Sequence, residues 1–325
     1  MRDCGLAGSG RGCGAVDEGE GIAAPPKLTP TQERLLEAGA AIRTDPGPMD
    51  FLHTVLAQTG LPYRDPGDEL RSWDRRQGNA LLAIEAGRIA DERTGTYRPV
   101  GLPWGEKARL VLIHLTGEAL RTNSPAIEVE DSLTAFVREL GLPTSGRSIR
   151  TVKDQLGRLS VATVRLALLG GSGVHQVQGT LVSGLDLWAP SDARQRVLWP
   201  SSVRLSDPFF ASIQRHAVPL SRIAIRALAH SALALDIYAW LAQRLHRIPP
   251  GKAQEISWAA LKEQFGPGYD RMPDFRKRFR QAMREALTVY PEAKVEEEAG
   301  LVLRTSPPPI SKRPTAGRVL EPVEE

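Results

Sequence analysis

The order of helix-like and strand-like segments along this chain is the feature that most limits its fold. Three successive segments, 108–120, 130–141 and 148–160, repeat apolar residues at helical spacing. Two alternating runs around a Gly-Gly-Ser-Gly turn follow over 161–183 and predict a β-hairpin. We therefore expect three helices and then a hairpin in the first part of the folded chain.

The same order recurs in the second part of the chain. A helix is predicted over 206–216, and a long apolar helix with a break at Ser231 is predicted over 221–248. The remaining predicted elements are a short helix at 256–266, a strongly basic helix from Pro273 onward and a final hairpin at 293–306.

Three helices followed by a hairpin is the chain order of a winged helix, and this chain has the order twice. We therefore predict a mainly α fold with small β-hairpins (α+β), built from tandem winged-helix domains. The expected regions are a disordered leader at 1–45, an N-terminal winged-helix domain at 46–205 with a preceding helix at 50–60 and short strands at 81–100, a C-terminal winged-helix domain at 206–310, and a disordered tail at 311–325.

The third helix of each predicted unit is basic on its outer side. In the C-terminal unit, Phe275, Phe279 and Met283 share one arc of the helical wheel, which predicts that this arc packs on the core. The opposite arc is rich in Arg. The residues that we predict to contact DNA are Arg147, Arg150, Thr151, Lys153 and Arg158 in the N-terminal unit, and Arg276, Lys277, Arg280, Gln281 and Arg284 in the C-terminal unit.

Two interpretations of these basic helices stay open at the level of sequence. Either their outer faces are only solvated, as most charged helix faces are, or they bind nucleic acid. A major groove admits one helix, and its base edges are read by side chains such as Arg on guanine and Gln on adenine. We favour nucleic-acid binding, because dense like charges destabilise a helix unless an anion offsets them and because both third helices show the pattern.

No pattern typical of catalysis or of cofactor binding is present. Residues 249–253 contain a Gly-Lys pair, but they lack the preceding Gly and the following hydroxyl residue of a phosphate-binding loop. The 6 His are never within two positions of one another, unlike the His pair of a metal-dependent nickase. We therefore predict no cofactor, no metal ion and no enzymatic activity.

Composition limits the compartment in which the protein works. Only Cys4 and Cys13 occur, so neither a disulfide framework nor a cysteine-based zinc site is available. No stretch approaches the ~18 consecutive apolar residues of a membrane helix, and the first residues lack the apolar core of a secretory signal. We expect a soluble, cytoplasmic protein without membrane contact.

Several segments together resemble one known family. The C-terminal segments are LALDIYAWLAQRL (233–245), ISWAALKEQFG (256–266), FRKRFRQAMREALTVYPEAKVE (275–296) and GLVLRTSPPPI (300–310). The upstream segments are QTGLPYR, RQGNALLAIEAG, the stretch from GLPWGEKARLVLIHLTGEAL to RELGLPTSG, and DQLGRL. In this order they resemble the plasmid-encoded RepA replication initiators over about residues 50–310, whereas the Gly-rich leader has no counterpart.

The resemblance implies a DNA-binding protein that acts at a plasmid origin. Such a protein would recognise direct repeats in double-stranded origin DNA, promote opening of the duplex and recruit the host replication initiator and replicative helicase. It also implies a winged-helix architecture and binding of the protein's own promoter as a homodimer. No base-contacting residue is taken from the family.

Two other functions are compatible with parts of the sequence. One is a winged-helix transcriptional regulator, an autorepressor that never initiates replication. The other is a catalytic nickase or primase, which the missing metal-binding and nucleotide-binding motifs argue against.

Overall fold

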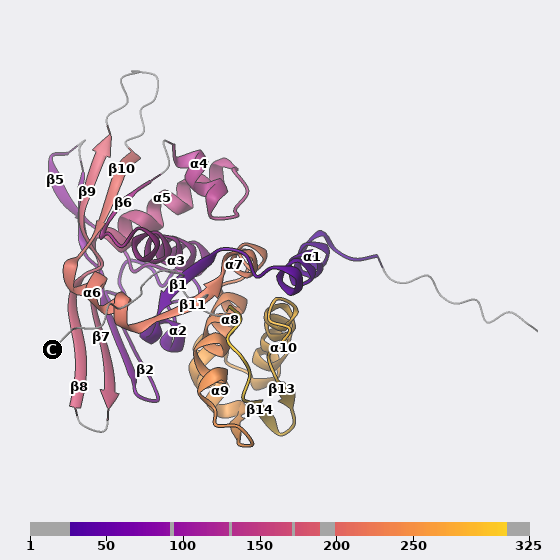
Figure 1. Ribbon diagram of the computed structural model, residues 1–325. Coiled ribbons are helices and arrows are strands. Elements are labelled where there is room, and N and C mark those ends of the chain that lie inside the picture. The colour runs from indigo at the N-terminus through magenta and orange to yellow at the C-terminus, as the bar shows by residue number, and fades with distance from the viewer. Residues whose placement is uncertain (1–26, 92–93, 130–131, 171–172, 189–198, 311–325) are drawn as a thin grey trace, which may run out of the picture.

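The chain has a mixed α+β fold that combines helices with one four-stranded sheet and several smaller sheets (Figure 1). The computed structural model describes residues 27–91, 94–129, 132–170, 173–188 and 199–310. A four-stranded antiparallel sheet of order β2-β3-β7-β8 forms one side of the molecule, on the left in Figure 1. We call residues 49–216 the N-terminal half and residues 217–310 the C-terminal half.

The elements follow one another in this order. The first helix and the N-terminal half comprise α1 (Pro30–Thr44), β1 (Met49–His53), α2 (Thr54–Thr59), β2 (Ser72–Gln77), β3 (Ala80–Glu85), β4 (Arg88–Asp91), β5 (Thr96–Pro99), α3 (Gly105–Thr122), β6 (Ala126–Glu128), α4 (Leu133–Glu139), α5 (Gly146–Val161), β7 (Thr163–Gly170), β8 (Gly173–Thr180), β9 (Val182–Trp188), β10 (Trp199–Leu205) and α6 (Asp207–His216). The C-terminal half comprises β11 (Ala217–Ser221), α7 (Arg222–Ala227), α8 (Ala232–Arg244), the 3-10 turn η1 (Leu245–Arg247), β12 (Ala253–Ser257), α9 (Trp258–Phe265), α10 (Met272–Thr288), β13 (Val295–Glu297) and β14 (Gly300–Arg304).

One topology occurs in both halves. In the N-terminal half, α3, β6, α4 and α5 are followed by β7 and β8 and then by the hairpin β9–β10, and β6, β9 and β10 pair in the order β6-β10-β9. In the C-terminal half, α8, β12, α9 and α10 are followed by the hairpin β13–β14, and the strands pair in the order β12-β14-β13. β6, the strand after α3, therefore pairs with the last strand of the N-terminal half. In the same way β12, the strand after α8, pairs with the last strand of the C-terminal half.

The predicted first hairpin exists, but its place in the fold differs from the prediction. Residues 161–183 contain β7 and β8, and β7 pairs with β3 rather than with β6. The physical reason is apolar matching, because buried Val164 and Leu166 of β7 lie opposite buried Ile84 and Leu82 of β3. The hairpin at the position of a wing is β9–β10, and residues 189–198 between its strands lie outside the described part of the chain.

The predicted helix at 50–60 is only half correct. Residues Met49–His53 form β1, which pairs antiparallel with β11 across Met49↔Ser221 to His53↔Ala217, and only α2 is helical. Pairing with a strand more than 160 positions away is a tertiary interaction that overrides local helical spacing. The helix ends, as predicted, at Gly60, whose φ of 67° favours glycine.

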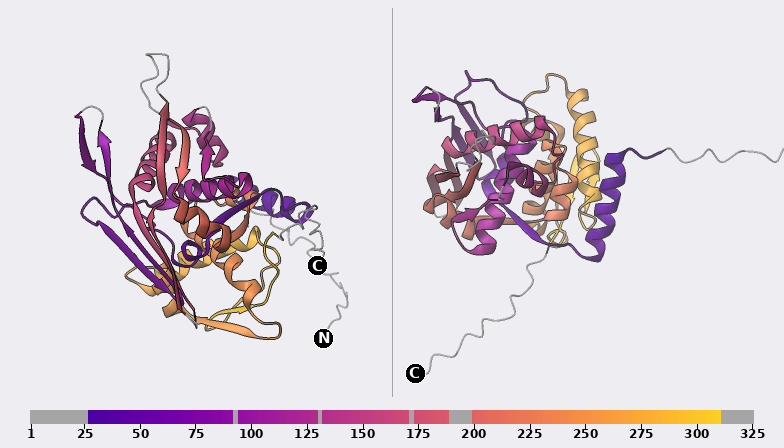
Figure 2. Two further views of the ribbon diagram at one scale, coloured as in Figure 1. Left: turned by 60° about the vertical axis from the view of Figure 1, so that its left-hand side comes forward. Right: turned by 90° about the horizontal axis from the view of Figure 1, so that it is seen from above.

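The predicted leader at 1–45 contains an ordered helix. α1 begins with a capping box in which Thr29 and Gln32 satisfy each other's backbone N–H groups. Its apolar residues Leu35 and Ile42 are buried, and the helix lies against α7 and α10 (Figure 2, right). At Gly39 the carbonyl oxygen of Thr288 leaves no room for a Cβ atom, so this position requires glycine. Residues 1–26 and the predicted tail at 311–325 lie outside the described residues.

The predicted long helix over 221–248 consists of α7, α8 and η1. The break at Ser231 is confirmed, because the Ser231 hydroxyl accepts a hydrogen bond from the N–H of Ala234 at 3.2 Å and caps α8. α6, which we had assigned to the C-terminal domain, contacts β8 and α3 of the N-terminal half. The proposed domain boundaries themselves stay a prediction.

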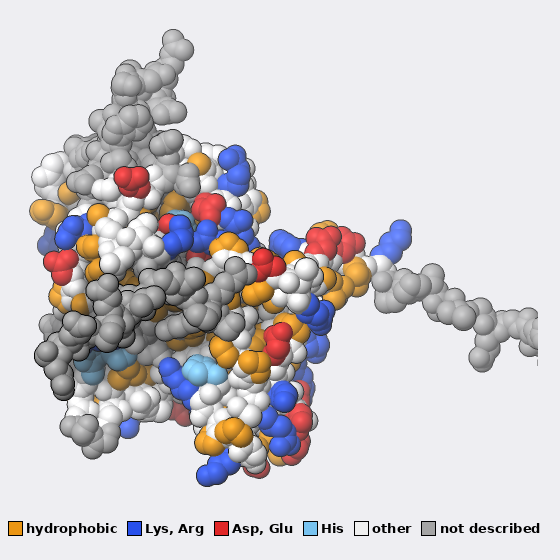
Figure 3. Space-filling view, in the orientation of Figure 1, with side chains coloured by type: hydrophobic (Ala, Val, Ile, Leu, Met, Phe, Trp, Pro, Cys, Tyr) orange, Lys and Arg blue, Asp and Glu red, His pale blue; other side chains and the backbone are white. Residues whose placement is uncertain are grey.

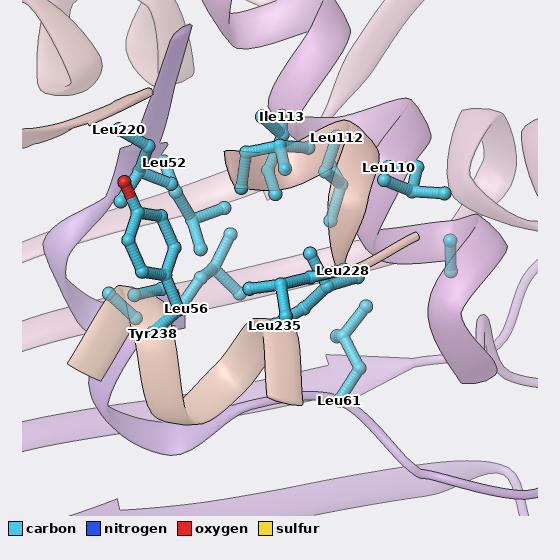
Figure 4. Packing of buried hydrophobic residues seen from close by; sticks show 14 of the residues in the cluster. Leu52, Leu56, Leu61, Leu110, Leu112, Ile113, Leu220, Leu228, Leu235 and Tyr238 are labelled. Carbon is cyan, nitrogen blue, oxygen red and sulfur yellow. The ribbon is translucent and has the colours of Figure 1, made fainter. Parts of the chain in front are cut away.

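The apolar core is continuous between the two halves. Figure 4 shows Leu52 and Leu56 of the N-terminal half facing Leu220, Leu235 and Tyr238 of the C-terminal half. The hydroxyl of Tyr238 accepts a hydrogen bond from the backbone N–H of Ser221 at 3.0 Å, so this fully buried ring also satisfies a backbone donor.

A buried ion pair joins α3 to α8 inside this core. Nε and Nη2 of Arg109 donate to the two carboxylate oxygens of Asp236 at 2.6 and 2.7 Å, and only 4% and 9% of the two side chains are exposed. The remaining guanidinium donors reach the carbonyl oxygens of Leu61, Pro62 and Gly105. Every N–H of the Arg109 guanidinium therefore has an acceptor.

We expect Asp236→Asn to lower the free energy of unfolding by about 3–5 kcal/mol, because it leaves the Arg109 charge buried without its carboxylate. Urea denaturation measures this loss. The matched control is Asp207→Asn, since Asp207 pairs with Arg204 at the surface with 78% of its side chain exposed, and such pairs contribute at most about 1 kcal/mol. Equal losses for the two variants would contradict the prediction.

His114 of α3 supplies a test of the core by pH. Burial, together with the nearby charges of Arg222, Arg121 and Arg226, lowers the pKa of His114 to about 4, below the ordinary value of 6.5. The folded state therefore holds His114 neutral, and the stability from this residue is complete above pH 6.5 and is lost as the pH falls from 6.5 towards 4.

Replacing His114 by Leu should make the unfolding free energy depend less steeply on pH. The expected difference in slope between pH 6.5 and 4 is at most about 1.4 kcal/mol per pH unit, the free energy of one proton equilibrium. Urea denaturation of both proteins over this range measures it, and identical slopes would show that His114 titrates normally in the folded state.

Candidate nucleic-acid interface

α10 is held in place by an aromatic core on its inner side. Phe275 and Phe279 are fully buried, and both rings pack edge-on against Trp258 of α9, at centroid distances of 6.4 and 5.8 Å. Pro273 in the first turn has no backbone N–H that would need a partner there. The apolar arc predicted from the sequence is thus confirmed as the packed face of this helix.

The opposite side of α10 carries the predicted contact residues. Lys277, Gln281 and Arg284 are exposed, whereas Arg276 is half-buried. The guanidinium groups of Arg276 and Arg280 each lie 5.1 Å from the ring centroid of Trp258, within the range of a cation–π contact. The Trp258 ring therefore contacts two of the five predicted residues, Arg276 and Arg280, and restricts their side chains.

Arg280 is not a free cation. Its Nε and Nη2 donate to Oε1 of Glu297 on β13 at 2.8 and 2.6 Å, and this hydrogen-bonded carboxylate raises the pKa of Arg280. Glu297 belongs to the acidic run 296–298. The strand that follows α10 thus supplies a carboxylate that competes with any phosphate for Arg280.

Gln281 also has partners within the protein. Its Oε1 accepts from Nη1 of Arg278 at 2.8 Å, and its Nε2 donates to Oε1 of Glu285 at 3.1 Å. Both partners lie on the same helix, where Arg278 is exposed but only 14% of the Glu285 side chain is exposed and Glu285 also pairs with His230. A base edge would have to replace both contacts of Gln281. Arg284 and Lys277 form no ion pair with any described residue.

α5 presents a second set of cations at the equivalent position of the N-terminal half. Ser145 caps the helix, and buried Val152 and Leu156 fix its inner side. Arg147, Arg150 and Lys153 are exposed, and none pairs with a carboxylate within the described part of the chain. The Thr151 hydroxyl instead donates to the carbonyl oxygen of Arg147 at 2.9 Å, which leaves it half-buried along its own helix.

Arg158, which was also predicted to contact DNA, is largely buried and has partners within the protein. Its Nη1 lies 3.4 Å from a carboxylate oxygen of Asp65 and donates to the carbonyl oxygen of Leu102, while its Nε lies 2.9 Å from Asp154. Only 12% of the side chain is exposed. Arg158 has the helical-wheel position that was predicted for it. However, Asp65 in the loop before β2 lies beside this end of α5, and its carboxylate pairs with the Arg158 guanidinium.

Some cations near these helices were missed by the sequence reasoning. Arg278 was outside the predicted stripe because its wheel position lies to one side of it, although it belongs to the same basic run. Arg88 and Arg98 lie on the hairpin β4–β5, and β4 contacts α5. No local pattern indicated that this hairpin would lie beside α5, since the contact is tertiary.

The surface around α10 mixes charges of both signs. Figure 3 shows Lys and Arg side chains along the side of the molecule where α10 and β13 lie, at the lower right, with Asp and Glu between them. The interface proposed from α10 is therefore a set of individually placed cations rather than a uniformly positive patch.

The described residues hold no cluster of three His, Cys, Asp or Glu arranged to bind a metal ion. Three histidines do meet in space, because His216 lies 6.1 Å from His53 and 4.8 Å from His175 between ring centroids. Both ring nitrogens of His53 are already used, one by the hydroxyl of Ser212 and one by the N–H of Val55.

None of the helices in the described ranges combines the length and apolarity needed to cross a bilayer.

Two of the solved structures that are similar to this chain are of domains 2 and 3 of RctB. One is 10% identical in sequence with a TM-score of 0.46, and it covers 77% of this chain and 96% of its own. The other is 12% identical with a TM-score of 0.44, and it covers 77% of this chain and 94% of its own. Comparison with curated protein sequences gives no significant match.

The family comparison concerns the stretch that joins the two halves. The model of the family described as plasmid encoded RepA protein matches residues 102–260, from the residues just before α3 to the first turn of α9. This stretch contains α5, α8 and the buried Asp236. The resemblance seen in the sequence is thereby confirmed over residues 102–260, the stretch that this family model matches.

Proposed function

We propose that this protein is a plasmid replication initiator that binds repeated sequences in double-stranded origin DNA. The observation that carries the proposal is the repetition of one arrangement. In each half, the third helix of the same topology exposes cations that no described carboxylate neutralises: Arg147, Arg150 and Lys153 on α5, and Lys277 and Arg284 on α10.

The repeated topology supports a tandem winged-helix architecture as part of this proposal. A winged helix places its third helix in the major groove, where one helix fits between the phosphate walls. Two such helices in one chain would enter successive grooves on one face of the duplex, about one helical turn apart. Phosphate contacts would then supply most of the affinity, and Arg and Gln contacts the sequence preference.

Duplex opening, recruitment of the host replication initiator and the replicative helicase, action as a homodimer and a place in the cytoplasm complete the proposal. They follow from the family resemblance and not from any contact seen in the structure. We further propose that the protein acts by binding and not by catalysis, so that its partners perform the chemistry.

The alternative is a winged-helix autorepressor that binds the same repeats without initiating replication. α5 and α10 would serve both functions equally well. A plasmid that carries the gene with its upstream repeats separates them, because only an initiator supports autonomous replication that is lost when the gene is deleted.

We expect Arg284→Ala to weaken binding to the cognate repeat by about 1–3 kcal/mol if the side chain reads a base edge. If Arg284 contacts a phosphate instead, binding should weaken on all sequences, and the salt dependence should fall by about one charge. Electrophoretic mobility shifts at several salt concentrations distinguish these cases.

The control for Arg284→Ala is Arg215→Ala. Arg215 is an exposed cation on α6, outside both third helices, so its loss should leave binding to the repeat unchanged. Binding of Arg284→Ala that equals that of the parent protein would remove α10 from the interface.

Removing the carboxylate of Glu297 should have the opposite effect. Glu297→Gln frees Arg280 and removes a negative charge beside the proposed duplex, so we expect tighter binding and a salt dependence that is steeper by roughly one charge. The control is Glu296→Gln, since Glu296 pairs with Arg304 of β14 and not with α10. Weaker binding after Glu297→Gln would mean that the pair positions Arg280 for contact and does not compete with DNA.

A further inference from the structure

A cavity of about 390 Å³ lies at the junction of the two halves. Its walls come from the loop after α2, from β2 and the first turn of α3, from the link between α7 and α8, from the turn between α9 and α10, and from α10 itself. We propose that this cavity binds one nucleotide unit, a planar base joined to a phosphate. The proposal deepens the proposed function and depends on it, because it gives a nucleic-acid-binding protein a second site, for a base outside the duplex.

Aromatic side chains form the apolar part of the lining. Tyr63, Trp73 and Tyr269 all line the cavity, and all three are half-buried, so part of each side chain stays available to a ligand. Tyr63 and Trp73 are packed from another side by the guanidinium groups of Arg109 and Arg75, at 4.9 and 5.5 Å from their ring centroids. Ordered aromatic rings that keep an open side are the platforms on which unpaired bases stack.

The charge that remains at the cavity is positive. Its two carboxylates are Glu106, which pairs with Lys107 at 2.5 Å, and Asp65, which shares the Arg158 guanidinium with Asp154, at 3.4 and 2.9 Å. Its two arginines, Arg64 and Arg278, form no ion pair with any described residue. Once these internal ion pairs are counted, the lining keeps a net positive charge. An anionic group is therefore the ligand that complements it.

His230 adds no free charge to the cavity. Its ring nitrogens contact Glu285 and Arg34 at 3.2 and 3.0 Å, so the histidine is held between α10 and α1. The aromatic lining and the two unpaired arginines then define the ligand class, because a nucleotide combines a planar base with an anionic phosphate. An acidic peptide would satisfy the arginines but would leave the aromatic rings without a stacking partner.

The position of the cavity connects it to the proposed duplex site. Arg278 lies on α10, one position from Lys277 of the outer face, and it donates to Gln281 of that face. A strand that leaves the duplex beside α10 would thus reach a cavity that Arg278 and the aromatic rings line together. The volume of the cavity lies at the lower end of the range of small-ligand sites, which suits one nucleotide and not a folded strand.

The test compares single-stranded with duplex binding in the full chain. Fluorescence anisotropy of a short labelled oligothymidylate measures the first, and mobility shift of the duplex repeat measures the second. Tyr269→Leu should lower the affinity for oligothymidylate at least about fivefold, which is the lower bound for the stacking of one base. Tyr269→Phe, the matched control, keeps the ring and should bind like the parent protein.

Arg64→Gln is the second variant, because Tyr269 also packs on Phe275 and its replacement could disturb α10. Arg64 is exposed, and its loss should weaken oligothymidylate binding and make it less dependent on salt. Neither Arg64→Gln nor the control Arg215→Gln should change binding to the duplex repeat.

The outcomes are distinguishable. The nucleotide site is refuted if both Tyr269→Leu and Arg64→Gln bind oligothymidylate like the parent protein. It is also refuted if polyglutamate displaces oligothymidylate from the parent protein but not from Arg64→Gln. Displacement by thymidine monophosphate at comparable concentration supports the site with a free nucleotide as its source, and displacement only by the oligomer supports a nucleic-acid strand. If the parent binds oligothymidylate through these residues but no duplex repeat, the proposed origin function fails while the cavity assignment stands.

Discussion

The ion pair between Arg109 and Asp236 is the interaction on which the arrangement of the two halves depends. It is buried, bidentate and completed by three carbonyl oxygens, so it tolerates little movement of α3 relative to α8. The loop before β2 must approach it closely, and at Gly60 an added Cβ would lie 2.7 Å from an oxygen of Asp236. Positive φ and this close approach both demand glycine there.

Two further contacts hold the same junction. β1 and β11 pair over five residues, and Arg222 at the start of α7 donates to Asp50 at 2.7 Å and reaches Glu118 and Glu139 of the N-terminal half. A strand pair, a buried ion pair and a charged cluster thus connect the units that carry α5 and α10. A protein that places two helices on one duplex needs this rigidity, because each loose joint would cost ordering entropy on binding.

Local patterns predicted most elements and the inner faces of both basic helices. The helices at α3, α4, α5, α9 and α10, the break at Ser231 and the final hairpin were visible because each depends on periodicity or capping within a few residues. β1 was not visible as a strand, and the partner of β7 was not predictable, because both depend on pairing between distant segments. α1 was underestimated because its burial depends on packing against α7 and α10.

The same limit applies to the candidate site. The wheel identified which residues point outward from α5 and α10, and the exposed positions of Arg147, Arg150, Lys277 and Arg284 agree with it. It could not identify which cations are already neutralised. Asp65, from a loop more than 90 positions away, holds Arg158, and Glu297, from the strand after α10, holds Arg280. These two carboxylates come from outside the helix that each one modifies, whereas Asp154, the other partner of Arg158, lies four positions away on α5 itself.

The central claim is that α5 and α10 lie on one duplex at the same time. Hydroxyl-radical footprinting of the cognate repeat tests it most directly. The account predicts two protected segments on one face of the DNA, about one helical turn apart, of which Arg147→Ala with Arg150→Ala weakens one and Lys277→Ala with Arg284→Ala weakens the other. A single protected segment that either pair of substitutions abolishes completely, or that neither pair changes, would contradict it.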